Sequence, residues 1–535
     1  MPAGTGSAGA ARPTVIRFAP AYTPQPRKKV ERSEADVLRR GFYFLLFATL
    51  AFRLWLAQVT PITGDEAYFI YWGRWPDWGF YDHPPMIGWW LALLLQFHDA
   101  EWWLRLPIVI LPAILALATA AFLHRHDAAR AWLAATLVLL APVNVWGVFI
   151  TTDTPLIYFS FFSALAFLRA ARDDDPRFYL LAGVLLGGAF LSKYFAVLLG
   201  IAYAAHVLYR PNRRKFLGLL LLVLGALPGP LLNVWWNMGH CWANIMFNVY
   251  NRHGNAGWSW KTPPLYAVMM LYVLTPLAVW ALARSRGPLA ELARQGEGRA
   301  LLWVGFLPLA LFAVLSLVKT IGMHWVLSFV PFALMAAALA ADSAMAHKLR
   351  RFFLGFAALH VAAIAVIAML PVETWQRTRL YDGIVMTVKP QELLERLQPY
   401  ANDYEFAADG YSPAVTLSYN ARRYFFVFGE ASSHARHDDI VTDFRRLDGR
   451  NILVLRKSPP QDADYRPYFR EVEYRSFDLR GATYHLVLGR HFNYPAYRDA
   501  ILERVRERYY DIPAWLPQSG CYFCQRYFPD RPCRK

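Results

Sequence analysis

The sequence predicts an α-helical polytopic membrane protein with a smaller α/β domain at its C-terminal end. Of its 535 residues, 56% are hydrophobic and only 18% are charged, and the mean hydropathy is +0.22. Apolar runs of about 20 residues, the length of helix that crosses a bilayer, recur along the first 371 positions. Five of these runs contain no acidic or basic side chain: residues 131–150, 216–236, 262–283, 300–318 and 325–341.

Residues 1–40 precede the first apolar run and are basic. They hold eight Lys or Arg residues against three acids, and they are rich in Pro, Ala and Gly. This composition is typical of a disordered segment, and we expect a disordered cytoplasmic tail. The short apolar core and cleavage site of a signal peptide are absent from it, so we expect the helix that follows, residues 41–59, to be retained as an anchor.

The loops between the apolar runs have a consistent charge pattern. When the tail is placed in the cytoplasm, the loops assigned to that side carry at least as many basic as acidic residues, as the positive-inside rule expects. These loops are residues 124–130, 169–177, 210–215, 284–299 and 347–351. The threading gives about 11–13 crossings of a bacterial inner membrane, with the C-terminal domain in the periplasm.

Two apolar segments do not fit a single crossing. Residues 86–97 are too short to cross comfortably and are expected to lie along the interface. Residues 178–209 are too long for one crossing and fit two short helices that turn near Ser192, Lys193 and Tyr194. We therefore expect a transmembrane domain over residues 41–371, with its first periplasmic loop at residues 60–102.

The formal net charge of +17 does not indicate a nucleic-acid-binding protein. The ionic segments fall between apolar runs and at the two ends of the chain. This is the pattern of membrane topology and of contact with anionic lipids. We expect membrane lipids as partners and no nucleic acid.

After Pro371 the composition changes to that of a water-exposed domain. Residues 422–429 and 450–457 are typical of strands, whereas residues 390–400 and 497–510 are typical of helices. These patterns predict a periplasmic α/β domain over residues 372–535, and its sequence gives no sign of a catalytic site of its own.

All four cysteines fall outside the cytoplasm on this threading. They are Cys241, Cys521, Cys524 and Cys533. An oxidising compartment predicts one or two disulfides among them. The alternative is a zinc site made by the last three.

Residues 64–85 contain an unusual concentration of functional groups. They hold eight aromatic residues and four carboxylates, Asp65, Glu66, Asp77 and Asp82, directly after the first apolar run. Carboxylates at a membrane interface are costly unless they meet water, partners or a substrate. An interfacial belt of rings with solvated acids is the alternative, and we favour it for Asp77.

One chemistry needs carboxylates at this level: the transfer of a group from a lipid-phosphate donor to an acceptor hydroxyl at the membrane surface. A carboxylate takes the proton from the attacking hydroxyl. Cationic or hydrogen-bonding groups stabilise the charge on the departing phosphate, and aromatic rings can stack on sugar faces.

Two motifs in this loop resemble a known family. Asp65-Glu66-Ala67-Tyr68, followed by Tyr81-Asp82-His83-Pro84-Pro85, is similar to the GT-C membrane glycosyltransferases. The likeness is to the bacterial branch of the protein O-mannosyltransferase-like family, which includes lipid A aminoarabinose and galacturonosyl transferases. It extends over roughly residues 41–371, with weaker similar stretches at residues 151–159, 187–199, 233–242 and 324–325.

The resemblance implies a GT-C fold and an enzyme that uses a polyprenyl-phosphate sugar donor. It makes Asp65 the general base or acceptor-orienting group and Glu66 its supporting neighbour. It associates Asp82 and His83 with the donor phosphate. His83 stands where the aminoarabinose transferase has a lysine, so its charge depends on pH near neutrality. Among the rings, Tyr68 and Tyr81 become candidates for contact with the acceptor.

Other polar residues at the same membrane level are further candidates. Asp153 is either a second carboxylate of the active site or an acid favoured by the dipole at a helix start. In the first case, Asp153 and Asp65 are both candidate metal ligands. Lys193 pairs with donor phosphate or snorkels to the interface. Arg53 contacts the phosphate or, in our preferred interpretation, pairs with a loop acid. A basic cluster is expected to hold an anionic headgroup; its members are Arg252, His253, Lys319 and His324.

Several alternatives stay open from the sequence. The acceptor is lipid A or core glycan in the leading interpretation, and a polysaccharide or a protein in the second. A lipid or sugar transporter is the alternative from another class, although no inverted repeat is visible and the polar residues gather at one face. The transferred sugar is not identified. No cofactor is predicted beyond a divalent metal as one possibility.

Overall fold

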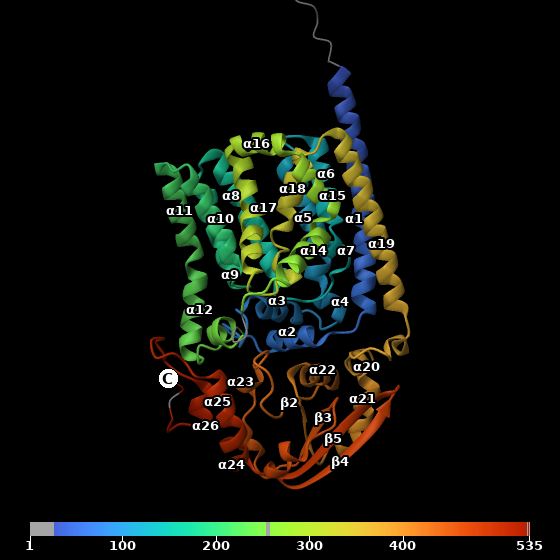
Figure 1. Cartoon of the computed structure of the whole chain (residues 1–535), viewed down its shortest axis with the longest axis vertical. Coiled ribbons are helices and arrows are strands. Elements are labelled where there is room, and N and C mark those ends of the chain that lie inside the picture. The colour runs from blue at the N-terminus through green and yellow to red at the C-terminus, as the bar shows by residue number, and fades with distance from the viewer. Residues whose placement is uncertain (1–25, 253–256, 532, 534–535) are drawn as a thin grey trace, which may run out of the picture.

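The computed structural model describes residues 26–252, 257–531 and 533. It consists of a helical bundle and a mixed-sheet domain placed at one end of that bundle (Figure 1). Between the two lie α2 (Gly64–Arg74) and α3 (Met86–Leu95), nearly perpendicular to the long helices (Figure 1). The candidate loop of the sequence therefore forms the junction between the two parts.

The first helix, α1 (Pro26–Val59), starts earlier than the sequence predicts. Residues 26–40, expected as part of a disordered tail, are helical. The prediction is wrong for these residues, because Glu, Lys, Arg and Leu are good helix formers and continue the apolar helix without a break. The rest of the predicted tail lies outside the described residues.

Six helical spans among the described residues are long and apolar enough to cross a membrane. They are Glu34–Val59 within α1, Glu101–Leu123 (α4, Glu101–Leu104, with α5, Leu106–Leu123), α8 (Asp153–Asp173), Arg213–Gly239 (α11, Arg213–Ala226, with α12, Pro228–Gly239), α17 (Gly296–Leu315) and α19 (Ser343–Met369). The chain is thus a multi-pass membrane protein, as predicted.

Shorter apolar helices complete the bundle. They are α3, α6 (Ala128–Leu139), α9 (Pro176–Phe190), α10 (Ala196–Tyr209) and α18 (Val330–Ala340). The expected count of crossings is larger than six or seven because it included segments that fold as these shorter helices. The predicted turn near residues 192–194 is confirmed by the break between α9 and α10.

The run of residues 262–283 is not one straight crossing. It forms α14 (Thr262–Leu274) and α15 (Pro276–Arg284), which are bent by 92° relative to each other. Thr275 between them has φ +72°, and Pro276 has no N–H with which to continue the first helix. The prediction of a single crossing here is corrected accordingly.

The C-terminal domain is built on a five-stranded sheet of order β2-β1-β3-β5-β4. The strands are β1 (Glu405–Ala408), β2 (Phe426–Val427), β3 (Ile452–Arg456), β4 (Phe469–Leu479) and β5 (Ala482–Phe492). β1 is parallel to β2 and β3, and β5 is antiparallel to β3 and β4. The strand predicted at 450–457 is confirmed, whereas only two residues of the segment 422–429 are in a strand.

Alternation along β3 gives the sheet two apolar faces. Leu453 and Leu455 pack in a core with α20 (Tyr381–Val388), α21 (Pro390–Leu397) and α22 (Tyr411–Ala421). Ile452 and Val454 pack in a second core with residues of the C-terminal end. That second core also contains Tyr81 and Trp242 from the bundle loops, so the domain is packed onto the bundle through a shared apolar core.

Two disulfides confirm the prediction from the cysteines. Cys241 is bonded to Cys521, and Cys524 to Cys533. The first bond joins the bundle to the end of the sheet domain. Because all four cysteines are paired, the alternative of a zinc site at the C-terminal three is not favoured.

Candidate active site

Glu66 has a structural role. Thr63 and Glu66 form a capping box at the start of α2, which satisfies N–H groups that the first turn leaves unpaired. The Glu66 carboxylate is fully buried and forms a bidentate pair with Arg105, with both N···O distances 2.7 Å. It also accepts the backbone N–H of Ile150 at 3.0 Å. Glu66 therefore fixes α2 to the bundle, a supporting role as the resemblance implies and not that of a reacting group.

Arg105 was not singled out in the sequence. Its other N–H groups donate to the backbone carbonyls of Ala57, Thr60 and Pro61 at 2.7–2.9 Å. The sequence signal that could have identified Arg105 is its position inside an otherwise apolar run. A charge buried in such a run needs an acid partner.

Asp65 is the neighbour of Glu66 but is exposed. Its Oδ1 accepts a hydrogen bond of 2.7 Å from the hydroxyl of Tyr411, at the start of α22. The two residues are 346 positions apart, so the sheet domain contributes directly to the environment of the candidate base. Close packing of the two helices supports this contact: a Cβ added at Gly64 would lie 2.5 Å from Ser412 Oγ.

Asp82 lies buried beside Asp65. It accepts a long hydrogen bond of 3.4 Å from the hydroxyl of Tyr68, which in turn accepts the backbone N–H of His437 at 3.2 Å. Burial raises the pKa of the Asp82 carboxyl to about 7, and the charge of Asp65 adds to the rise. Asp82 is thus suited to hold a proton near neutral pH, whereas Asp65 meets solvent.

His83 opens onto a cavity of about 350 Å³ on the bundle side. The cavity has polar and cationic lining, from His83, Lys193, Tyr194, Asn248, Arg252 and Lys319, and apolar lining, from Pro84, Phe195, Val249, Leu315, Val318 and Trp325. Burial lowers the pKa of His83 well below its ordinary range, and the charges of Lys193 and Arg252 lower it further. His83 is therefore a neutral hydrogen-bonding group here.

Lys193 and Asp153 form a buried pair at the wall of this cavity. The Lys193 ammonium donates to both carboxylate oxygens of Asp153, at 2.8 and 3.0 Å. The pair explains why an acid at the start of α8 and a lysine between α9 and α10 lie at this depth. Asp153 therefore holds the Lys193 ammonium in a fixed position beside the cavity.

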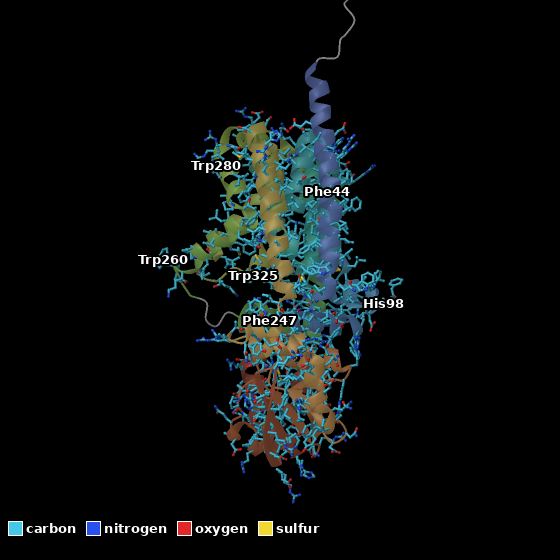
Figure 2. The ribbon with its side chains drawn as sticks, turned by 90° about the vertical axis from the view of Figure 1, so that its right-hand side faces the viewer. Phe44, His98, Phe247, Trp260, Trp280 and Trp325 are labelled. Carbon is cyan, nitrogen blue, oxygen red and sulfur yellow. A yellow bond between two sulfur atoms is a disulfide. The ribbon has the colours of Figure 1, made fainter. Side chains whose placement is uncertain are left out.

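Arg252 and Lys319 supply the remaining positive charge at the cavity. The Arg252 guanidinium lies over the rings of Phe247 and Trp325, 5.7 and 5.6 Å from their centroids, and Lys319 lies 5.9 Å from the Trp325 ring. Figure 2 places Phe247 and Trp325 near the junction of the bundle and the sheet domain. His324 is exposed next to Trp325, and His253 lies outside the described residues.

Two other candidates are buried away from this cavity. Arg53 donates to the backbone carbonyls of Val109 and Gly147, both at 2.8 Å, and to those of Ile108 and Asn144. Its guanidinium is thus bonded to the bundle backbone and, among the described residues, forms no ion pair with a loop acid. Tyr81 is 1% exposed and packs against Phe247 in the domain core, which removes it from the expected acceptor contacts.

The expected metal ligands are not gathered into a three-ligand set. Within the described ranges, the only group of three or more His, Cys, Asp or Glu residues close enough to share an ion is Cys521, Cys524 and Cys533. The oxygens of Asp153 are already bonded by Lys193. A metal site at Asp65 and Asp153 therefore has no further support from the geometry.

The fold and the arrangement of these residues define the class: a polytopic membrane protein of the GT-C type with a C-terminal sheet domain. Comparison with known proteins agrees with the resemblance predicted from the loop motifs. Residues 82–236 match the family described as dolichyl-phosphate-mannose-protein mannosyltransferase.

A curated relative and several solved structures, among them two of ArnT, are similar to this chain. The lipid A galacturonosyltransferase RgtD of Rhizobium johnstonii is 29% identical over 205 residues, which cover 36% of this chain and 43% of that protein. The aligned part thus spans less than half of the relative. ArnT from Cupriavidus metallidurans, bound to undecaprenyl phosphate and in the apo state, matches with TM-scores of 0.57 and 0.56 at 15% identity. Each match covers 84% of this chain and 98% of ArnT, and it shows a shared fold.

Proposed function

We propose that this protein is a glycosyltransferase that moves a sugar from a polyprenyl-phosphate donor to a hydroxyl of a lipid A or core glycan acceptor. The observation that carries the proposal is the juxtaposition of the two carboxylates, Asp65 and Asp82, with the cationic cavity at His83. A cavity with charged groups at one side and apolar walls at the other suits a lipid phosphate. The similar structure of ArnT with undecaprenyl phosphate supports this donor class.

The donor phosphate binds in the cavity beside Arg252 and Lys193, and His83 donates a hydrogen bond to it. The polyprenyl chain follows the apolar wall formed by Leu315 and Val318. A cationic group near the bond that breaks stabilises the negative charge that develops on the leaving phosphate.

Asp65 accepts the proton of the acceptor hydroxyl as that oxygen attacks the anomeric carbon. The new glycosidic C–O bond forms while the bond from the anomeric carbon to the phosphate oxygen breaks, and polyprenyl phosphate leaves. Tyr411 holds Oδ1 of Asp65, so Oδ2 is the oxygen directed to the acceptor. Asp82, with a pKa of about 7, is partly protonated at neutral pH and so adds less than a second full negative charge next to the reacting groups.

The reaction takes place on the periplasmic side of a bacterial inner membrane. Support comes from the basic loops at residues 210–215 and 284–299, which lie at the end of the bundle opposite the sheet domain (Figure 1). By the positive-inside rule that end faces the cytoplasm. The two disulfides on the other side agree with an oxidising compartment.

Mass spectrometry of lipid A and core from cells with and without the gene tests the proposal. We expect a discrete sugar mass to disappear in the deletion and to return with the wild-type protein but not with Asp65→Asn. Unchanged spectra in cells that contain the protein would refute a lipid A or core acceptor. Labelled sugar on protein or polysaccharide in the same cells would then identify the second acceptor class.

A further inference from the structure

A second cavity lies on the other side of α2, between the bundle and the sheet domain. It is enclosed by one face of α2, by α22, and by the segment leading into α23 (Asp438–Val441). Its volume is about 110 Å³, whereas a single water needs roughly 10–15 Å³. The space is on the scale of one small ring and is too small for acyl chains.

The walls of this cavity are aromatic. Tyr71 and Tyr424 face each other with nearly parallel rings, 6.2 Å between centroids and 29° between planes. Trp75 extends the same wall, 4.8 Å from Tyr71. Flat ring faces of this kind bury the C–H surface of a ligand while Tyr hydroxyls remain available for hydrogen bonds.

The floor of the cavity carries a polar atom without a partner. Nδ1 of His437 is buried and has no hydrogen-bond partner among the described residues. Native structures leave few such atoms unpaired, because each costs the desolvation of a polar group. Burial lowers the pKa of His437 to about 3, so the ring is neutral and suits a hydroxyl better than an anion.

Asp438 stands next to His437 on the same floor. It accepts the hydroxyl of Tyr424 and, at 3.3 Å, the backbone N–H of Val427. Burial raises the pKa of its carboxyl to about 7. The floor therefore combines donors and acceptors. Three arginines, Arg74, Arg422 and Arg423, also line the cavity, and two of them are paired with acids: Arg422 with Asp99 and Arg423 with Glu405.

Two tyrosines connect this cavity to the candidate catalytic carboxylates. Tyr411 lines the cavity and donates to Asp65, and Tyr68 lines it and donates to Asp82. Their ring centroids are 5.6 Å apart. A ring held in the cavity thus lies directly behind the residues that face the reaction.

We propose that the cavity between α2 and α22 is a saccharide subsite, which holds one uncharged sugar ring of the acceptor against the wall formed by Tyr71, Trp75 and Tyr424, with its hydroxyls on His437 and Asp438. Its description as an acceptor subsite rests on the proposed glycosyl transfer. The sheet domain then has a direct part in substrate recognition.

Saturation-transfer NMR on the full-length protein in detergent micelles tests the subsite. The probes are methyl glycosides of mannose, galactose, glucose and N-acetylglucosamine. We expect at least one to receive saturation through its ring protons, and Tyr71→Ala to reduce that signal at least fivefold. His437→Phe, which keeps an aromatic ring but removes the nitrogen, gives a similar reduction. Trp515→Ala, a change at an exposed ring of the same domain, leaves it unchanged.

The transfer reaction provides the second measurement and separates the two proposals. In Tyr71→Ala we expect the KM for the acceptor to rise about tenfold with the KM for the donor unchanged. Absence of binding by every methyl glycoside, or equal binding by wild type and Tyr71→Ala, overturns the subsite even if transfer is intact. Tyr71-dependent binding in a protein that transfers no sugar would refute the proposed function and leave a saccharide site.

Discussion

The two cavities on either side of α2 differ in composition and in the partners of their basic side chains. The one at His83 has three basic side chains, Lys193, Arg252 and Lys319, and an aliphatic wall from the bundle. The one at Tyr71 has aromatic walls from α2 and from the sheet domain and a floor of His437 and Asp438. Its lining also holds three arginines, of which Arg422 and Arg423 are paired with Asp99 and Glu405. A lipid phosphate needs positive charge and apolar surface together, whereas a neutral sugar needs flat rings and hydroxyl partners.

The difference indicates a division of work between the two parts of the molecule. On the proposed function and subsite, donor recognition belongs to the bundle, and acceptor recognition belongs to the surface where the sheet domain meets α2. Asp65 and Asp82 lie at the boundary and are reached by side chains from both parts. Changes on one side should therefore alter the handling of one substrate and leave the other largely unaffected.

The largest expected effect is at the boundary itself. Asp65→Asn removes the proton acceptor, so we expect transfer to fall by about 10²–10⁴-fold, the usual contribution of general base catalysis. Because the side chain is exposed, the melting temperature should stay within experimental error of wild type. Initial rates and thermal unfolding of the purified protein measure the two quantities. A variant that keeps wild-type rates would remove Asp65 from the mechanism.

A change at Lys193 affects both donor binding and stability. Lys193→Met leaves the Asp153 carboxylate buried without its partner, which typically costs about 3–5 kcal/mol. The double variant with Asp153→Asn should regain most of that stability but not the affinity for undecaprenyl phosphate. Denaturation curves and donor titrations distinguish the two effects. Full recovery of donor affinity in the double variant would contradict a phosphate contact by Lys193.

Asp438 gives the sheet-domain side a pH dependence. Its pKa is about 7 in the folded protein against an ordinary value of 3.8, so between these values the folded state binds more protons than the unfolded one. Its contribution to stability is therefore complete below about pH 4 and is lost as the pH rises through 7. At most it amounts to about 4 kcal/mol.

The comparison of wild type with Asp438→Asn measures this contribution. We expect the free energy of unfolding to fall less between pH 4.5 and 7.5 in the variant than in wild type. Asp443→Asn is the matched control, since Arg445 lowers the pKa of Asp443. Its contribution is present above the ordinary pKa and is lost only at lower pH. Identical pH profiles for wild type and Asp438→Asn would contradict a raised pKa.

The smallest expected effect is at the link between the domains. Tyr411→Phe removes one hydroxyl hydrogen bond to the Asp65 carboxylate, a bond to a charged group of about 1.5–3 kcal/mol. Part of it is replaced by water at this exposed position, so we expect kcat to fall about tenfold and the donor KM to stay the same. Tyr474→Phe, an exposed tyrosine of β4, is the control. An unchanged kcat would show that Tyr411 does not hold the base in position.

The sequence was sufficient to place those side chains whose location depends on local chain position. His83 is part of the motif at residues 81–85, and Lys193 lies at a predicted turn between two short helices. Both line one cavity in the structure. The charge pattern of the loops and the length of the apolar runs predicted the helical bundle, and the change in composition after Pro371 predicted the sheet domain. These properties are set by neighbours in sequence and by the membrane, and so they can be predicted from one chain.

Contacts between residues that are distant in sequence could not be predicted. Arg53 and Glu66 are polar residues next to a membrane. From the sequence alone, it is not possible to tell whether such a side chain is bonded within the protein or is available to a substrate. The structure shows both satisfied inside the bundle, by backbone carbonyls and by Arg105. Tyr411 and His437 were missed because nothing in their local sequence indicates that α22 and α23 fold back onto α2.

The disulfide between Cys241 and Cys521 sets a late point in biosynthesis at which folding of the protein can be completed. The two cysteines are separated by 280 positions, so the bond can form only after nearly the whole chain has left the ribosome. Docking of residues 517–521 onto the loop around Cys241, through hydrogen bonds to Met238 and from Trp242, is equally late. A chain that ends early keeps a free thiol at Cys241.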